Sequence, residues 1–235
     1  MRMILKKNIL NVFMLISFLL IINYHFTGNI VHEILGLVIL LFSLVHNKWN
    51  IYWYKYFLKV KEKNESIISI IVNFWVIILL VVAIGSGLFI SQTVLPIRVF
   101  HNMNFILLMH DVHHGSGYAV YLLVAIHFGM HWNMLWHKMK KIFQIEHYKY
   151  CCLVIGNILA IAIIINGIDT SFTNHIGSKL LMQHDFISWS KTTSGIQSFI
   201  DYFSIFGCYT AITAYIKGFL HFINYDFFHK RIDKE

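Results

Sequence analysis

The chain has few of the charged residues that a water-soluble protein places on its surface. Only 13% of its 235 residues are charged, a single proline is present (Pro96), and 57% are hydrophobic. Soluble domains contain about 25% charged and about 45–50% apolar residues. The shortage of charge argues against a soluble globular domain. The mean hydropathy of +0.63 indicates an integral membrane protein.

Cysteine motifs and nucleotide-binding motifs are also lacking. The three cysteines, Cys151, Cys152 and Cys208, form no CxxC or CxxCH spacing. This argues against a covalently attached c-type haem and against a thiolate zinc site. The chain has no dinucleotide-binding motif and no recognisable site for covalent flavin, so any flavin is expected on another protein.

Six apolar segments are long enough to cross about 30 Å of hydrocarbon as helices. No small-x-small cleavage site follows the first of them, so we expect it to be kept as a membrane helix. The segments are roughly 6–24, 30–47, 66–90, 113–136, 148–168 and 196–217. The sequence therefore predicts an all-α integral membrane protein with six transmembrane helices.

The basic residues predict the orientation of these helices. If the N-terminus is inside, sixteen of the nineteen Lys and Arg residues fall in inner segments, and only Arg98, Lys179 and Lys191 fall outside. This agrees with the positive-inside rule. We therefore expect a multi-pass protein of the bacterial inner (plasma) membrane with both termini cytoplasmic. The net charge of +8 is interpreted as a topology signal, and no nucleic-acid partner is expected.

Fifteen histidines in so apolar a chain require an explanation, because ionisable groups in membrane helices are costly and usually functional. The pattern H-x3-G-x9-H occurs twice, in the second and fourth predicted helices, which run in the same direction. The copies are His32, Gly36 and His46, and His113, Gly117 and His127. The repetition indicates an internal duplication.

The spacing within each copy suits a flat metal-containing ring. Histidines fourteen residues apart lie on one helix face, separated by about 21 Å along the axis. Because the two helices are parallel, His32 should face His113 near the outer surface, and His46 should face His127 near the inner surface. Each pair could hold the iron of one non-covalent haem b through neutral imidazole nitrogens.

The glycines fit the same interpretation, since Gly36 and Gly117 would let a ring lie against the helix backbone. Small residues also help helices to pack in lipid, which is the simpler alternative. Two other histidines remain alternative ligands. His131 lies one turn after His127 on nearly the same face, and His114 is adjacent to the outer histidine of its helix.

Several motifs resemble those of a known family. In the first half these are Thr27-Gly28-x3-His32-Glu33-x2-Gly36, His46 and Trp49, and in the second half Leu95-Pro96-Ile97, His113-x3-Gly117-Tyr118 and His127-Phe128-Gly129-Met130-His131-Trp132. Weaker tail motifs are Gly167-Ile168, His184-Asp185-Phe186 and Asp201-Tyr202-x4-Gly207. With these the chain resembles the flavinylation-associated cytochromes, compact bacterial relatives of the cytochrome b561 group, formerly a domain of unknown function. The resemblance implies a di-haem electron conduit that serves extracytoplasmic flavoproteins, with the same four histidines as ligands.

The sequence therefore predicts a duplicated four-helix, cytochrome b-like haem bundle over 1–140 and a two-helix membrane extension with a cytoplasmic tail over 141–235. The expected function is transfer of electrons across the inner membrane, as an electron-transfer subunit rather than a stand-alone oxidoreductase. The expected partners are membrane lipid, an extracytoplasmic flavoprotein and a quinol. Three alternatives stay open: a quinol-oxidising or ferric-reducing cytochrome enzyme, a histidine-based metal-ion transporter without haem, and a structural anchor for a redox partner.

A few other polar residues have two interpretations each. Glu33 could accept protons from a quinol, orient a ligand, or simply lie among lipid headgroups. Arg98 could pair with a haem carboxylate or be a plain surface residue. The histidines of the second outer loop could form a separate metal site or belong to a polar loop. That site would use His101, His110, His114 and Asp111.

Overall fold

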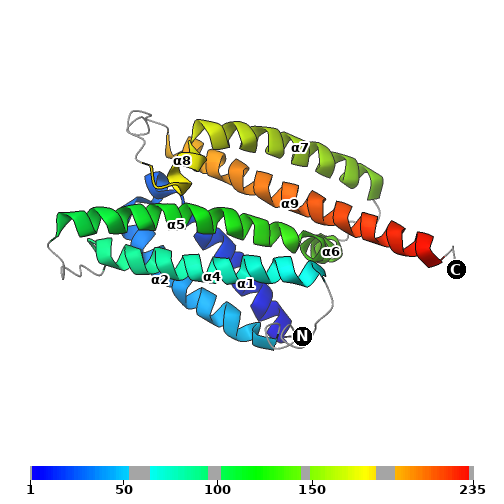
Figure 1. The fold of residues 1–235 in the computed structure, drawn as a ribbon, viewed down its shortest axis with the longest axis horizontal. Helices are drawn as coiled ribbons and strands as arrows, with labels where there is room; N and C mark the ends of the chain where they lie inside the picture. Colours follow the sequence, from blue (N-terminus) through cyan, green and yellow to red (C-terminus); the bar gives the residue numbers. More distant parts are fainter. Residues whose placement is uncertain (1, 53–63, 95–101, 144–148, 184–193, 233–235) are drawn as a thin grey trace.

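The structure, a computed structural model, describes residues 2–52, 64–94, 102–143, 149–183 and 194–232 (Figure 1). All regular secondary structure in these ranges is helical. Four of the described helices are long and apolar enough to cross a membrane. They are α2 (Tyr24–Trp49), α4 (Asn64–Ile90), α7 (Lys149–Thr173) and α9 (Gly195–Ile232). The chain is therefore consistent with a multi-pass membrane protein.

Two other predicted spans also form helices, but they are not among these four. They are α1 (Arg2–Ile21) and α5 (Met103–Met130). In α5 the reason is chemical, because four histidines and Asp111 lower the hydropathy of an otherwise apolar helix. At 1.5 Å per residue, α5 is about 42 Å long and α1 about 30 Å, so both have the length to span a bilayer.

The ends of α5 differ from the prediction of a span over 113–136. The helix begins ten residues earlier, where the Asn102 side chain accepts a hydrogen bond from the Asn104 backbone N–H at 3.0 Å. It ends at Met130, and after His131 the chain starts a separate helix, α6 (Trp132–Phe143). This short helix carries Lys138, Lys140 and Lys141 together with two tryptophans, a composition typical of a membrane interface.

The connection between α1 and α2 is tight. Asn23 lies in it, almost fully buried, and donates a side-chain hydrogen bond to the Leu19 carbonyl at 2.8 Å. A kink follows inside α2, where Gly28 has φ 72° and ψ 175°. Only glycine adopts a positive φ without a steric penalty, which explains its presence there.

The helices pack as antiparallel neighbours: α1 against α2, α4 against α5, and α7 against α9. In Figure 1 the start of α1 and the end of α9 lie toward the same end of the molecule. Between α2 and α5 the described residues make little direct backbone contact. The two helices that carry the histidine repeat are therefore placed by their partners rather than by each other.

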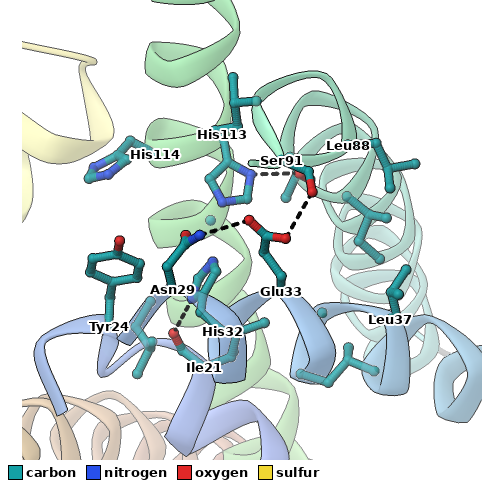
Figure 2. Close-up of a pocket in the computed structure, with 18 of the residues that line it drawn as sticks. Ile21, Tyr24, Asn29, His32, Glu33, Leu37, Leu88, Ser91, His113 and His114 are labelled. Atoms are coloured by element: carbon teal, nitrogen blue, oxygen red, sulfur yellow. Dashed lines mark hydrogen bonds between the residues drawn. The ribbon is translucent and has the colours of Figure 1, made fainter. Parts of the chain in front are cut away.

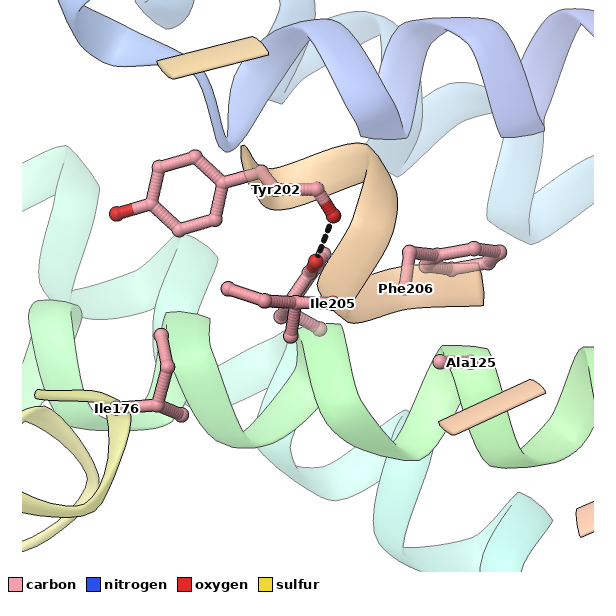
Figure 3. Packing of buried hydrophobic residues seen from close by; sticks show 6 residues of the cluster. Ala125, Ile176, Tyr202, Ile205 and Phe206 are labelled. Carbon is pink, nitrogen blue, oxygen red and sulfur yellow. Dashed lines mark hydrogen bonds between the residues drawn. The ribbon is translucent and has the colours of Figure 1, made fainter. Parts of the chain in front are cut away.

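The buried hydrophobic core joins the two predicted regions of the chain. It lies between α5, α9 and the short helix α8 (Ile176–Leu180) (Figure 3). Its members are Tyr121, Ala125, Ile176, Tyr202, Ile205 and Phe206. The Tyr121 hydroxyl donates to the Tyr202 carbonyl within it. The long helix α9 is thus packed on the central helix α5, with α7 packed in turn on α9. Residues of 1–140 and 141–235 therefore share one core.

Candidate cofactor site

The first pair of histidines meets near one end of the bundle, called the outer end below. His32 on α2 and His113 on α5 have ring centroids 5.9 Å apart, with their planes at 77°. Two imidazoles that coordinate one metal from opposite sides, through bonds of about 2.0–2.1 Å, place their ring centres roughly 6–6.5 Å apart. The observed spacing is close to that value, and Figure 2 shows both rings directed into the same space.

Each ring of this pair is fixed by a backbone carbonyl. His32 Nδ1 lies 2.9 Å from the Ile21 oxygen, and His113 Nδ1 lies 2.7 Å from the Ala83 oxygen. A carbonyl only accepts hydrogen bonds, so Nδ1 must carry the proton in both rings. In the neutral imidazole this leaves the Nε2 lone pair available to a metal.

The second pair is fixed by carboxamides. His46 Nδ1 lies 3.0 Å from Asn11 Oδ1, and His127 Nδ1 lies 2.7 Å from Asn73 Oδ1. The amide oxygen accepts in each case, so Nε2 is again left without a proton. His46 lies within electrostatic range of both His127 and His131, so three imidazoles gather at the inner end of the bundle.

The duplication extends to the helices that hold the acceptors. Asn11 and Ile21 on α1 are ten residues apart, and so are Asn73 and Ala83 on α4. In both hairpins the outer histidine bonds a backbone carbonyl and the inner histidine bonds an asparagine. This half of the repeat was not predicted, because the acceptors lie on other helices than the histidines. The signal was an asparagine at matching places in two apolar helices.

A cavity of about 520 Å³ surrounds the outer pair and is lined by residues of α1, α2, α4 and α5. Its size falls within the range of about 300–1,000 Å³ that is usual for ligand sites. Gly36 and Gly117 both line it. A Cβ added at Gly117 would meet no atom within 4 Å, and one at Gly36 would meet only Ile21 Cδ1, at 3.7 Å. These glycines border open space, as a flat ring against the backbone would require.

A third glycine was not singled out from the sequence. A Cβ added at Gly87 on α4 would lie 2.9 Å from His113 Cε1 and 3.0 Å from its Nδ1. The bare backbone of α4 therefore makes room for the His113 ring beside its acceptor, Ala83. The sequence signal was the Gly85-Ser86-Gly87 triplet inside an otherwise apolar helix.

The two alternative histidines lack such anchoring within the part of the chain that the structure describes. The His131 ring lies 4.8 Å from the His127 ring, and no hydrogen bond fixes it. The His114 ring stacks on His110 at 4.7 Å and lines the outer cavity. The geometry thus distinguishes the alternatives from His127 and His113, whose Nδ1 atoms are both fixed.

Glu33 binds the turn that follows α4. The acceptor is its carboxylate, and the donors are the Ser91 hydroxyl at 2.8 Å, the Val94 N–H at 2.7 Å, the Gln92 N–H at 3.0 Å and the Thr93 hydroxyl at 2.8 Å. The Asn29 side chain donates to it as well, at 2.9 Å. The carboxylate therefore joins the start of α2 to residues 91–94 at one side of the cavity (Figure 2). The Glu33 carboxylate is close to the outer histidine pair, but its hydrogen bonds go to the turn at residues 91–94.

The separate metal site predicted from His101, His110, His114 and Asp111 lies only partly within the described residues. Arg98 and His101 lie outside the described residues. Among the described ones, His110 Nδ1 lies 3.9 Å from Asp111 Oδ1. Within the described ranges, no group of three or more His, Cys, Asp or Glu side chains gathers as a metal site would require. A haem iron needs only two protein ligands, so this finding bears on the separate metal site and not on the histidine pairs.

Comparison with protein-family models, curated proteins and solved structures finds no match to this chain. The resemblance to flavinylation-associated cytochromes therefore stays a prediction drawn from the motifs.

Proposed function

We propose that this chain is a membrane-embedded b-type cytochrome that binds two haems and transfers electrons across the bacterial inner membrane. His32 and His113 would hold the outer haem, and His46 and His127 the inner one. One observation carries the proposal: all four histidines have Nδ1 fixed by an acceptor, which leaves Nε2 unprotonated in the neutral ring. Histidines that merely fill a helix interface would not share one bonding pattern in two copies.

The residues around each pair suit the role of axial ligation. An acceptor on Nδ1 fixes the tautomer and ring orientation, and it raises the basicity of the ligating nitrogen. The glycines leave space beside the outer pair, and α2 and α5 are held apart by their partners. Haem iron with two imidazole ligands supplies reversible one-electron chemistry when bound.

The proposal includes six membrane spans. Since α1 packs along α2, and α5 along α4, we infer that α1 and α5 cross the bilayer with their partners. The histidines of each helix are then stacked about 21 Å apart across the membrane. The resemblance adds the direction: electrons would be taken from a quinol and passed outward to an extracytoplasmic flavoprotein.

The first test is the haem content of the purified protein, expressed with haem supplied. We expect a reduced-minus-oxidised spectrum of low-spin b-type haem and two extractable haems per chain. His46→Ala and His127→Ala should each leave one haem. His131→Ala should leave two, and so should His137→Ala, which alters an exposed histidine of α6. A folded protein without haem would contradict the proposal and favour the metal-transport alternative.

Electron transfer itself is tested in sealed vesicles that contain a soluble reductant. Ferricyanide, which does not cross lipid, is added outside. The two-haem protein should then transfer electrons from the internal reductant to the external ferricyanide. His46→Ala, with one haem left, should lose most of this rate. An equal rate in the two proteins would mean that the haems do not form a transmembrane path.

A further inference from the structure

The short helix α8 is held in a fixed place at the outer end of α5. Its first residue, Ile176, is buried in the core. On either side the chain passes through the left-handed region, at His175 with φ 50° and Met182 with φ 55°. Residues other than glycine adopt such angles at an energetic cost, so the surrounding packing must impose them. The same packing fixes the position of Lys179, which α8 carries.

Lys179 makes an unusual set of contacts. Its Nζ donates to the Tyr202 hydroxyl at 3.3 Å, and it lies 5.1 Å from the ring centre of Tyr118. The two tyrosine hydroxyls are 2.8 Å apart. No carboxylate of the described residues pairs with this ammonium, although a lysine has three N–H donors. Aromatic groups therefore hold the ammonium of Lys179 in place, and it keeps N–H donors that a ligand could use.

These groups reach the outer cavity through Tyr118, which lines it together with His114. Lys179 and Tyr202 contact Tyr118 from behind this lining. Figure 2 shows His114 and Tyr24 on one side of the His32 and His113 pair, with Glu33 and Ser91 on the other. The cavity is therefore polarised, with an ammonium and phenols beside one side and a carboxylate on the opposite side.

We propose that Lys179, with the hydroxyls of Tyr118 and Tyr202, forms a subsite for a carboxylate of the ligand in the outer cavity. The inference rests on the proposed function, in which that ligand is haem with its two peripheral carboxylates. Attraction to the ammonium and repulsion by Glu33 both turn the carboxylate edge toward α8. Basic residues are scarce in the predicted outer segments, which contain only Arg98, Lys179 and Lys191. Of these three, Lys179 lies within the described residues.

The test compares two ligands that differ only in charge. The full-length apoprotein is titrated with iron protoporphyrin IX and with its dimethyl ester, in which both carboxylates are blocked. We expect Lys179→Met to weaken binding of the free acid at the outer site by about tenfold, the order of a charge-assisted hydrogen bond at a partly exposed site. It should leave ester binding within about twofold, while Lys179→Arg should retain most of the preference for the acid. Lys138→Met, at the inner end, should change neither affinity.

Each outcome decides the question. Equal weakening of acid and ester, or no change in either, would show that Lys179 does not bind a carboxylate. Since the lysine also packs on two rings, Lys179→Gln is titrated in parallel. If neither variant takes up the ester although the wild type does, Lys179 serves folding and the subsite is wrong. If the wild type binds neither compound, the proposed function itself fails, which is a different result.

Discussion

The asparagine on α4 is the residue most directly responsible for the orientation of His127. Its amide oxygen accepts from His127 Nδ1 at 2.7 Å. We predict that Asn73→Leu weakens binding of the inner haem by about 10–100-fold, the usual effect of removing such a partner from a metal-ligating histidine. Haem transfer to excess apomyoglobin measures this, and the outer haem serves as the internal reference.

Two variants separate this effect from a general loss of packing. Asn73→Asp keeps an oxygen acceptor in the same place and should hold the haem, with a lower reduction potential, because a carboxylate makes the imidazole more basic. Asn157→Leu removes an exposed asparagine on α7 that accepts a hydrogen bond from the Tyr215 hydroxyl, far along the chain from the histidines of the repeat, and should have no effect. If Asn157→Leu also loses haem faster, the effect of Asn73→Leu is not specific to the hydrogen bond with His127.

Gly87 offers a second test at the scale of single atoms. A methyl group at this position would lie 2.9 Å from the His113 ring, so the ring would have to move away from its acceptor. We predict that Gly87→Ala loses the outer haem and keeps the inner one. Gly85→Ala is the matched control, because an added Cβ there meets nothing within 4 Å. Both changes restrict the unfolded chain alike, so a difference in haem content must come from the site.

The repeat of histidines and glycines is visible in the sequence, whereas the role of their partners becomes visible only when it is known which helices pack together. The motif H-x3-G-x9-H is defined by residue spacing within a single helix, so its two copies can be recognised without knowing the fold. The acceptors Asn11 and Asn73, and the close approach of Gly87, depend on which helices pack together. Lys179 was counted only as an outer basic residue, since its position beside Tyr118 results from tertiary packing.

At the scale of elements, Glu33 ties α2 to the turn after α4. We predict that Glu33→Gln speeds hydrogen exchange of the Gln92, Thr93 and Val94 amides by about tenfold or more, because an amide accepts more weakly than a carboxylate. Exchange measured by mass spectrometry over a peptide covering 91–94 would show it.

The control for Glu33 is another outer carboxylate, Asp201. It accepts from the side chains of Gln197 and Asn174. Asp201→Asn should therefore leave exchange of 91–94 unchanged. If exchange in Glu33→Gln equals that of the wild type, the carboxylate does not hold this turn. Its place beside the cavity would then return attention to the proton-accepting role.

The limits of the helices were predicted less well than their existence. Apolar residues mark the part of a helix that can lie in lipid, so the fourth span was expected at 113–136. The backbone instead starts α5 at an asparagine cap before Met103 and breaks it after Met130. Hydrogen bonding at the ends sets these limits, and hydropathy does not report it.

For the whole molecule, the sequence predicted the helical class and the duplicated plan but not the place of the last two long helices. They were expected as an extension, yet α9 shares its buried residues with α5. Small residues allow this contact: a Cβ added at Gly129 would lie 2.5 Å from the Thr210 carbonyl oxygen. A glycine in an apolar helix indicates a close approach of another segment, and only the fold shows which segment it is.

The number of spans can be decided with reporter fusions placed along the chain. Alkaline phosphatase is active only outside, and a green fluorescent protein fluoresces only inside. If α1 and α5 cross the membrane, a reporter after residue 50 lies inside and one after residue 94 lies outside. If only α2, α4, α7 and α9 cross, both positions are reversed.

We expect the six-span pattern, because sixteen of the nineteen basic residues then lie inside. A fusion at the end of α9 reads inside in either arrangement and controls for insertion of the chain. A phosphatase-active fusion after residue 50 would leave α1 out of the membrane. The His46 and His127 pair would then lose its place at the inner surface, and stacking of the two haems across the bilayer would have to be abandoned.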